Sequence, residues 1–156
     1  MITVMGATGN TGRKIAEALL KAGEKVRALG RSESKLAELN SAGAEVLAGD
    51  TNDAGFLTRV FRGADAVYTL LPTDPRAADY RAEQDRQGEA IAKAIRDSGV
   101  RYVVALSSVG ADSSEAHGVI VGLRTGRTAQ KDRRHQFVAP SAGLILRELL
   151  RLSRFD

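Results

Sequence analysis

The chain has 156 residues, about one domain by length, and its 27% charged and 43% hydrophobic residues are typical of a globular protein and not of a disordered one. Cysteine is absent, which excludes a disulfide scaffold and any thiolate site, and no apolar run reaches the length of a membrane span, so we expect a cytoplasmic protein without a membrane partner. The net charge of +4 suggests a nucleic-acid partner, but tryptophan is absent and only 4% of residues are aromatic, which argues against binding by base stacking.

Short β-prone runs alternate with helical patterns over the first hundred residues. The sequence predicts strands over residues 2–5, 25–29, 44–48, 66–71 and 101–106. Apolar residues recur at helical spacing between them, as Ile15 and Leu19 do after the first strand, and a longer helix is expected over 77–97. The pattern predicts an α/β fold with a doubly wound parallel sheet, Rossmann-like and incomplete at the C-terminal side.

The segment between the first strand and the first helix is rich in glycine. Gly6, Gly9 and Gly12 follow at intervals of three, where backbone N–H groups and the positive end of the helix dipole favour a phosphate. This spacing differs from the usual G-x-G-x-x-G, but it allows a tight turn at Gly6, phosphate approach at Gly9 and close helix packing at Gly12. Three short polar side chains can bind the phosphate or brace the loop: Thr8, Asn10 and Thr11. A glycine-rich turn without a ligand is the alternative, and the βα context favours dinucleotide binding.

The end of the second predicted strand selects between cofactors. An acidic residue at this position would bind the ribose hydroxyl of NAD, whereas this sequence has Gly30-Arg31-Ser32, with Lys35 about one helical turn further on. Arg31 is placed to form charge-assisted hydrogen bonds with a 2′-phosphate. A solvated surface arginine is the alternative, so the sequence favours NADP and leaves NAD open.

The later strand ends supply the remaining candidates. Asp50, next to Thr51, is placed to accept a hydrogen bond from an adenine amine, and it is an equally good turn or helix-capping residue. The wall of the cofactor cleft has three candidates, Leu70, Leu71 and Pro72, and the alternative is that they are simply core followed by the end of a strand. Ser107 ends the fifth strand, where a nicotinamide or a substrate would lie, although a serine there also commonly satisfies loop backbone. The residues identify no metal site and no catalytic group.

Several of these segments together resemble the NmrA-like group of atypical short-chain dehydrogenase/reductases. The resemblance covers about residues 1–123 and rests on the glycine loop, the turn at 30–32, Gly49-Asp50 and the run VVALSSVG at 103–110. It implies a Rossmann domain that binds NADP(H) or NAD(P)H. The cofactor roles that it implies fall on Gly6, Thr8, Gly9, Asn10, Thr11, Gly12, Arg31 and Asp50. Some members resemble quinone or azo-dye reductases, which implies hydride transfer from NADPH to a small acceptor; others are redox-sensing regulators, which would have a regulatory protein partner.

The chain departs from the short-chain dehydrogenases in two respects. The usual Tyr-x-x-x-Lys pair is absent, because the last tyrosine, Tyr102, lies within the fifth predicted strand. Family members also continue with a small substrate-binding lobe, so the chain resembles a cofactor-binding half. Enzyme activity is therefore left open at this point.

The last 33 residues carry the whole basic excess. Residues 1–123 hold 15 Lys and Arg against 16 Asp and Glu, whereas residues 124–156 hold 8 against 3. One choice of codons for 124–136, read one base later, encodes EQEERLKKIDGIN, which resembles the acidic helix with which related proteins continue. We therefore expect 124–156 to be an atypical basic tail produced by a frameshift, not an independent domain. A divergent tail, able to bind nucleic acid, is the alternative, and the spacing of its apolar residues still allows a short amphipathic helix on the sheet: Leu144, Ile145, Leu149, Leu150 and Leu152. If the later strands of the family's sheet are missing, an apolar sheet edge would be exposed, which favours self-association.

The frameshift makes a prediction about the gene. Resequencing across the codons for residues 122–127 should reveal one inserted or deleted base, after which the reading frame continues with the acidic helix of the relatives. An alternative frame without that continuation would establish the basic tail as genuine.

Overall fold

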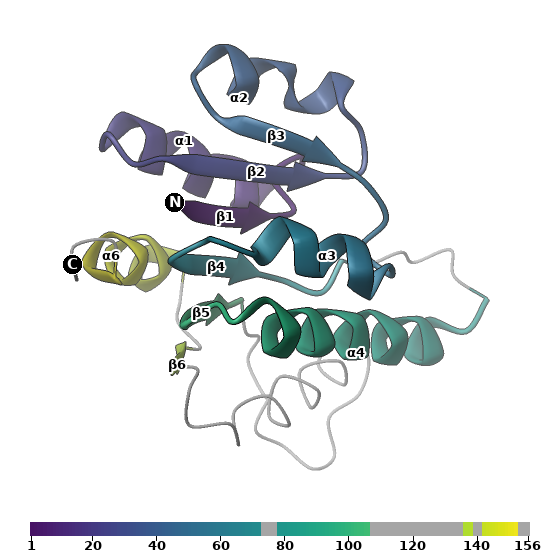
Figure 1. Ribbon diagram of the computed structural model, residues 1–156. Coiled ribbons are helices and arrows are strands. Elements are labelled where there is room, and N and C mark those ends of the chain that lie inside the picture. The colour runs from purple at the N-terminus through teal and green to yellow at the C-terminus, as the bar shows by residue number, and fades with distance from the viewer. Residues whose placement is uncertain (73–77, 107–135, 139–141, 153–156) are drawn as a thin grey trace.

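The computed structural model describes residues 1–72, 78–106, 136–138 and 142–152, which form an open sheet with helices on both faces (Figure 1). All strand pairs are parallel, and the order is β3-β2-β1-β4-β5-β6. The strands are β1 (Ile2–Met5), β2 (Val26–Gly30), β3 (Glu45–Ala48), β4 (Ala66–Thr69), β5 (Tyr102–Ala105) and β6 (Gln136–Val138). The helices are α1 (Asn10–Lys21), the short 3₁₀ helix η1 (Ser34–Leu36), α2 (Ala37–Ser41), α3 (Ala54–Phe61), α4 (Tyr80–Ser98) and α6 (Ala142–Leu152). The predicted doubly wound parallel sheet is confirmed.

Strand β1 lies where the order of the sheet reverses. The chain adds β2 and β3 on one side of β1 and then crosses to add β4, β5 and β6 on the other. Ile2 is in register with Val26 of β2 and with Ala66 of β4, so β1 is paired along both edges. In open α/β sheets, ligands bind outside the carboxyl ends of the strands at such a reversal. The topology therefore directs attention to the ends of β1, β2 and β4.

Alternating strand residues divide the core into two clusters, one on each face of the sheet. Val4 belongs to the cluster that includes Leu19 of α1, whereas Met5 belongs to the cluster that includes Phe61 of α3 and part of α4. Every residue of β1 and β4 is buried, which explains the nearly continuous apolar composition of these strands. Strand β4 ends at Thr69, earlier than the apolar run predicts, so the two leucines that follow lie in the loop.

The structure contains a strand and a helix beyond Leu106, where the sequence shows no clear alternation of strand and helix patterns. Strand β6 pairs with β5, and α6 packs against α1, β4 and β5. Ile145, Leu149 and Leu152 of α6 are buried, so the apolar spacing of this segment does place an amphipathic helix on the sheet. The boundary at residues 123 and 124 lies outside the described residues, and the frameshift stays a prediction. Among the described helices, none has both the length and the apolar character needed to cross a membrane.

Candidate functional site

The glycine loop makes a tight turn at the carboxyl end of β1. Gly6 has a φ of +69°, a left-handed conformation that favours glycine, and the Gly9 N–H donates to the Gly6 carbonyl at 2.9 Å. The Ala7 N–H donates to the Leu29 carbonyl at 2.9 Å, which ties the loop to the end of β2. The loop is therefore anchored to both central strands, with the tight turn at Gly6 that the sequence predicts.

Gly12 and Gly9 are glycines for different physical reasons. A Cβ on Gly12 would lie 2.4 Å from the Gly6 carbonyl oxygen and 2.9 Å from the Met5 carbonyl oxygen, so the first turn of α1 packs directly on the loop backbone. A Cβ on Gly9 would meet only the Gly6 oxygen, at 3.4 Å, which is an ordinary contact. Gly9 also has an extended backbone, with a φ of −98°. No contact within the fold explains a glycine at position 9, and its exposed position leaves room for a ligand to approach the backbone.

The N-terminus of α1 is open to an anion. Its N-cap is Gly9, which has no side chain to accept a hydrogen bond from the first-turn N–H groups, and its first turn contains no acidic residue. The nearest cation along the helix, Arg13, is held by Glu17 and Glu38. The exposed N–H groups and the helix dipole therefore provide a positive end without a side-chain partner.

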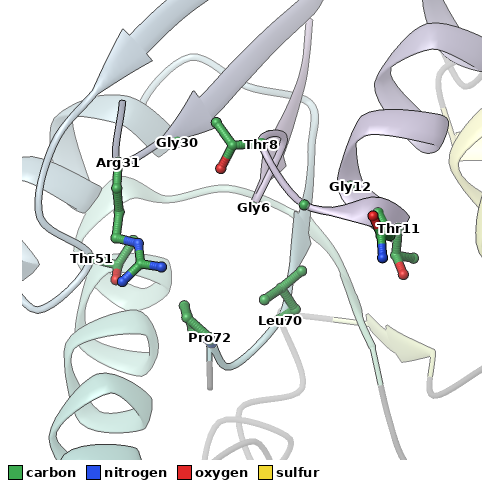
Figure 2. A pocket seen from close by; sticks show the side chains of 11 residues that line it. Gly6, Thr8, Thr11, Gly12, Gly30, Arg31, Thr51, Leu70 and Pro72 are labelled. Carbon is green, nitrogen blue, oxygen red and sulfur yellow. The ribbon is translucent and has the colours of Figure 1, made fainter. Parts of the chain in front are cut away.

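This helix end borders a cleft of about 240 Å³ (Figure 2). Its lining comes from the glycine loop, the first turn of α1, the end of β2 and the loops after β3 and β4. The lining residues are Gly6, Thr8, Gly9, Asn10, Thr11, Gly12, Gly30, Arg31, Thr51, Leu70 and Pro72. Arg31 is the only charged residue among these described lining residues, so the cleft is suited to an anionic ligand.

Arg31 follows β2 directly and lies exposed at one end of the cleft. Figure 2 shows its guanidinium beside Thr51. Gly30, which precedes it, is buried, and a Cβ there would lie 2.5 Å from the Thr8 Cγ2 atom. Glycine at position 30 thus allows Thr8 to lie over the end of β2. The sequence identified Gly30 only as part of a turn, because the need for glycine comes from a neighbour 22 residues away in the chain.

The loop after β3 presents Thr51 to the cleft and not Asp50. The Asp50 carboxylate accepts a hydrogen bond from the Asn52 N–H at 2.9 Å, which is the turn role that the sequence left open. Asp53, and not Asp50, caps α3 by accepting from the Phe56 N–H at 3.0 Å. Asp50 is exposed and does not line the cleft, whereas Thr51 is buried and does.

The loop after β4 supplies an apolar wall. Leu70 packs on the glycine loop, since a Cβ at Gly6 would lie 2.7 Å from the Leu70 Cδ2 atom. Pro72, which the sequence also predicts as a candidate for the cleft wall, lines the cleft as well. Leu71 packs against the opposite core cluster, with α3 and α4.

Two further residues predicted from the sequence are not among the described lining residues of the cleft. Lys35 is exposed on η1 and is not among the lining residues, and Ser107 lies outside the described residues. Tyr68, a potential acid by residue type, is fully buried in the core, where desolvation raises the pKa of its phenol to about 12. Within the described residues, no cluster of acidic and histidine side chains could hold a metal ion. The site thus consists of a binding cleft whose described part contains no proton donor of tyrosine type.

Comparison with known proteins identifies the family of this chain. Residues 1–124 match the model of the NmrA-like family. The chain belongs to the NmrA-like family. A (4-alkanoyl-5-oxo-2,5-dihydrofuran-3-yl)methyl phosphate reductase of Streptomyces griseus is 38% identical over 120 residues, 77% of this chain and 39% of that protein. An NAD(P)H azoreductase of Xenophilus azovorans is 30% identical over 152 residues, 96% of this chain and 50% of that protein.

A solved structure shares the fold of this NmrA-like chain. The triphenylmethane reductase of Citrobacter sp., determined as a complex with NADP(H), superposes with a TM-score of 0.76 at 26% identity. The match covers 90% of this chain and 49% of that structure. The chain thus spans half or less of the length of the relatives named here.

Substitution of the two glycines should lower stability by different amounts. We expect Gly12→Ala to lower the free energy of unfolding by roughly 1–3 kcal/mol, because its methyl group would overlap loop backbone that cannot move aside. Gly9→Ala should cost less than about 1 kcal/mol, the scale of an unfavourable N-cap residue. Urea unfolding of both variants measures the difference, and equal losses would contradict the packing described for Gly12.

Proposed function

We propose that the cleft binds the dinucleotide NADP(H) and that the complete protein is an oxidoreductase acting on a small quinone-like acceptor. The observation that carries the proposal is the placement of an uncapped helix N-terminus and a single cation, Arg31, in one cleft at the reversal of a parallel sheet. The chemistry that NADPH supplies when bound is hydride donation from its nicotinamide.

Each lining residue has a role in this proposal. The first-turn N–H groups of α1 bind the pyrophosphate, and Gly9 leaves the backbone open to it. Arg31, at the end of β2, binds the 2′-phosphate that distinguishes NADP from NAD. Leu70 and Pro72 exclude water from one side of the dinucleotide, and their apolar surfaces suit the faces of its rings.

The relatives favour a reductase over a sensor that binds without turnover. The proteins from Streptomyces, Xenophilus and Citrobacter are each named as reductases, and the Citrobacter structure contains NADP(H). These reductases are named for different acceptors, so the likeness to them does not by itself identify the acceptor of this protein. A planar, conjugated acceptor of quinone type is the proposal for this protein.

Charge reversal at Arg31 tests the cofactor preference. We expect Arg31→Glu to weaken NADPH binding at least tenfold while NADH binding changes less than threefold, because only NADPH carries the 2′-phosphate. Arg96→Glu provides the matched control, since Arg96 is exposed on the C-terminal half of α4 and does not line the cleft. Calorimetric titration of both cofactors gives the dissociation constants. An unchanged preference for NADPH in Arg31→Glu would refute the assignment of Arg31.

Turnover is tested separately from binding. We expect the protein to oxidise NADPH when a quinone is added, and Gly9→Ala to abolish this while the variant stays folded. The loss of NADPH absorbance over a panel of quinones measures the rate. Tight NADPH binding without oxidation by any quinone in the panel would overturn the proposed reaction and favour a sensing role.

A further inference from the structure

The buried side of α4 is polar in its N-terminal half and apolar in its C-terminal half. Ala90, Ile91, Ala94 and Ile95 bury the C-terminal half against the sheet and α3, but the same stripe continues as Gln87 and Gln84, which are only 6% and 1% exposed. Figure 1 shows this half of the helix extending beyond the arrowhead of β4. The change from apolar to polar residues therefore occurs where the helix leaves the sheet and reaches the loops at its carboxyl edge.

Gln84 holds the wall of the cleft. Its Nε2 donates a hydrogen bond to the Pro72 carbonyl oxygen at 2.8 Å, and Pro72 lines the cleft. Because a carbonyl can only accept, this bond fixes the orientation of the amide and leaves its Oε1 on the other side. That oxygen is buried and has no hydrogen-bond partner among the residues that the structure describes.

A half-satisfied buried amide does not stabilise a fold by itself. A buried acceptor without a donor costs about as much free energy as one hydrogen bond contributes, so the two contributions of Gln84 offset each other. An apolar side chain of similar volume would serve the core as well. What the amide adds is a fixed position for Pro72, 12 residues earlier in the chain.

Glu83, the residue before Gln84, holds the second loop. Its carboxylate accepts from the Asn52 Nδ2 at 3.0 Å, and Asn52 adjoins the cleft-lining Thr51. Arg86 and Gln87 donate to the same carboxylate at 2.5 and 3.0 Å. These hydrogen bonds, led by that from Arg86, hold the pKa of Glu83 below its ordinary value, so it is ionised at neutral pH.

We propose that Glu83 and Gln84 are positioning residues that fix the adenosine end of the cleft through Asn52 and Pro72. One turn of α4 thereby sets the separation between the loops after β3 and β4, and Figure 2 shows Thr51 and Pro72 close to Arg31 at this end. The ligand fragment concerned is the adenosine 2′-phosphate half of the dinucleotide. The inference rests on the proposed binding of NADP(H).

Substitution of Gln84 separates positioning from stability. In Gln84→Met the dissociation constants of NADPH and of adenosine 2′-monophosphate should rise roughly 3- to 10-fold, the value of one hydrogen bond. The unfolding midpoint should stay the same or rise, because a partly buried Pro72 carbonyl remains within reach of water while an unpaired oxygen is removed. Ile91→Met is the control, since Ile91 is also buried on α4 and does not line the cleft, and its effect on affinity should be under about twofold.

The second loop is tested with exposed residues, which avoids effects on folding. Asn52→Ala should weaken adenosine 2′-monophosphate by a similar factor, whereas Asn40→Ala, an exposed asparagine on α2, should leave it unchanged. Unchanged affinity in Gln84→Met, or a parallel fall of affinity and unfolding midpoint, would overturn the positioning role while wild-type binding upheld the proposed function. If the wild-type chain binds neither NADPH nor adenosine 2′-monophosphate, the proposed function itself fails.

Discussion

The close contact between the first turn of α1 and the loop after β1 is the constraint on which the site depends. Gly12 has no room for a Cβ against the carbonyls of Gly6 and Met5, so the helix begins almost in contact with the strand end. This contact aims the uncapped N–H groups of α1 across the carboxyl edge of the sheet, where the strand order reverses. A helix displaced outward by one methyl group would still bury Leu19, but its first turn would no longer lie against the loop backbone at Gly6. The geometry of the anion site is therefore a result of backbone packing.

The rest of the cleft is assembled from loops that need separate support. Leu70 closes over Gly6 because glycine leaves room for its Cδ2 atom, and Thr8 lies over Gly30 for the same reason. Farther out, α4 holds the described parts of the loops after β3 and β4 through hydrogen bonds to Asn52 and Pro72. Small residues thus set the inner part of the cleft, and polar side chains of α4 set the outer part.

The sequence predicts most of this arrangement where the signal is local. The alternation of strands and helices, the turn at Gly6 and the position of Arg31 all follow from residues within a few positions of one another. The sequence does not reveal the roles of Gly30 and Gln84, because these roles come from contacts with distant segments, and a lone glycine or glutamine has many other uses. Asp50 illustrates the reverse case, since its residue type suits both a ligand and a turn: the structure shows the hydrogen bond of the turn, from the Asn52 N–H, and the adenine role stays a prediction.

Electrostatics explain why one arginine can decide the cofactor. Residues 1–123 carry nearly balanced charges, with 15 Lys and Arg against 16 Asp and Glu, so the cleft lies in no general positive field. Within it Arg31 is the only charged lining residue, and the neighbouring Arg13 is held by Glu17 and Glu38. A second phosphate on the ribose would find one unshared cation in the described lining, together with the helix N-terminus for the pyrophosphate. Because no carboxylate in that described lining competes for the guanidinium, its full charge is available to a ligand, and the proposed preference for the phosphorylated cofactor rests on this one side chain.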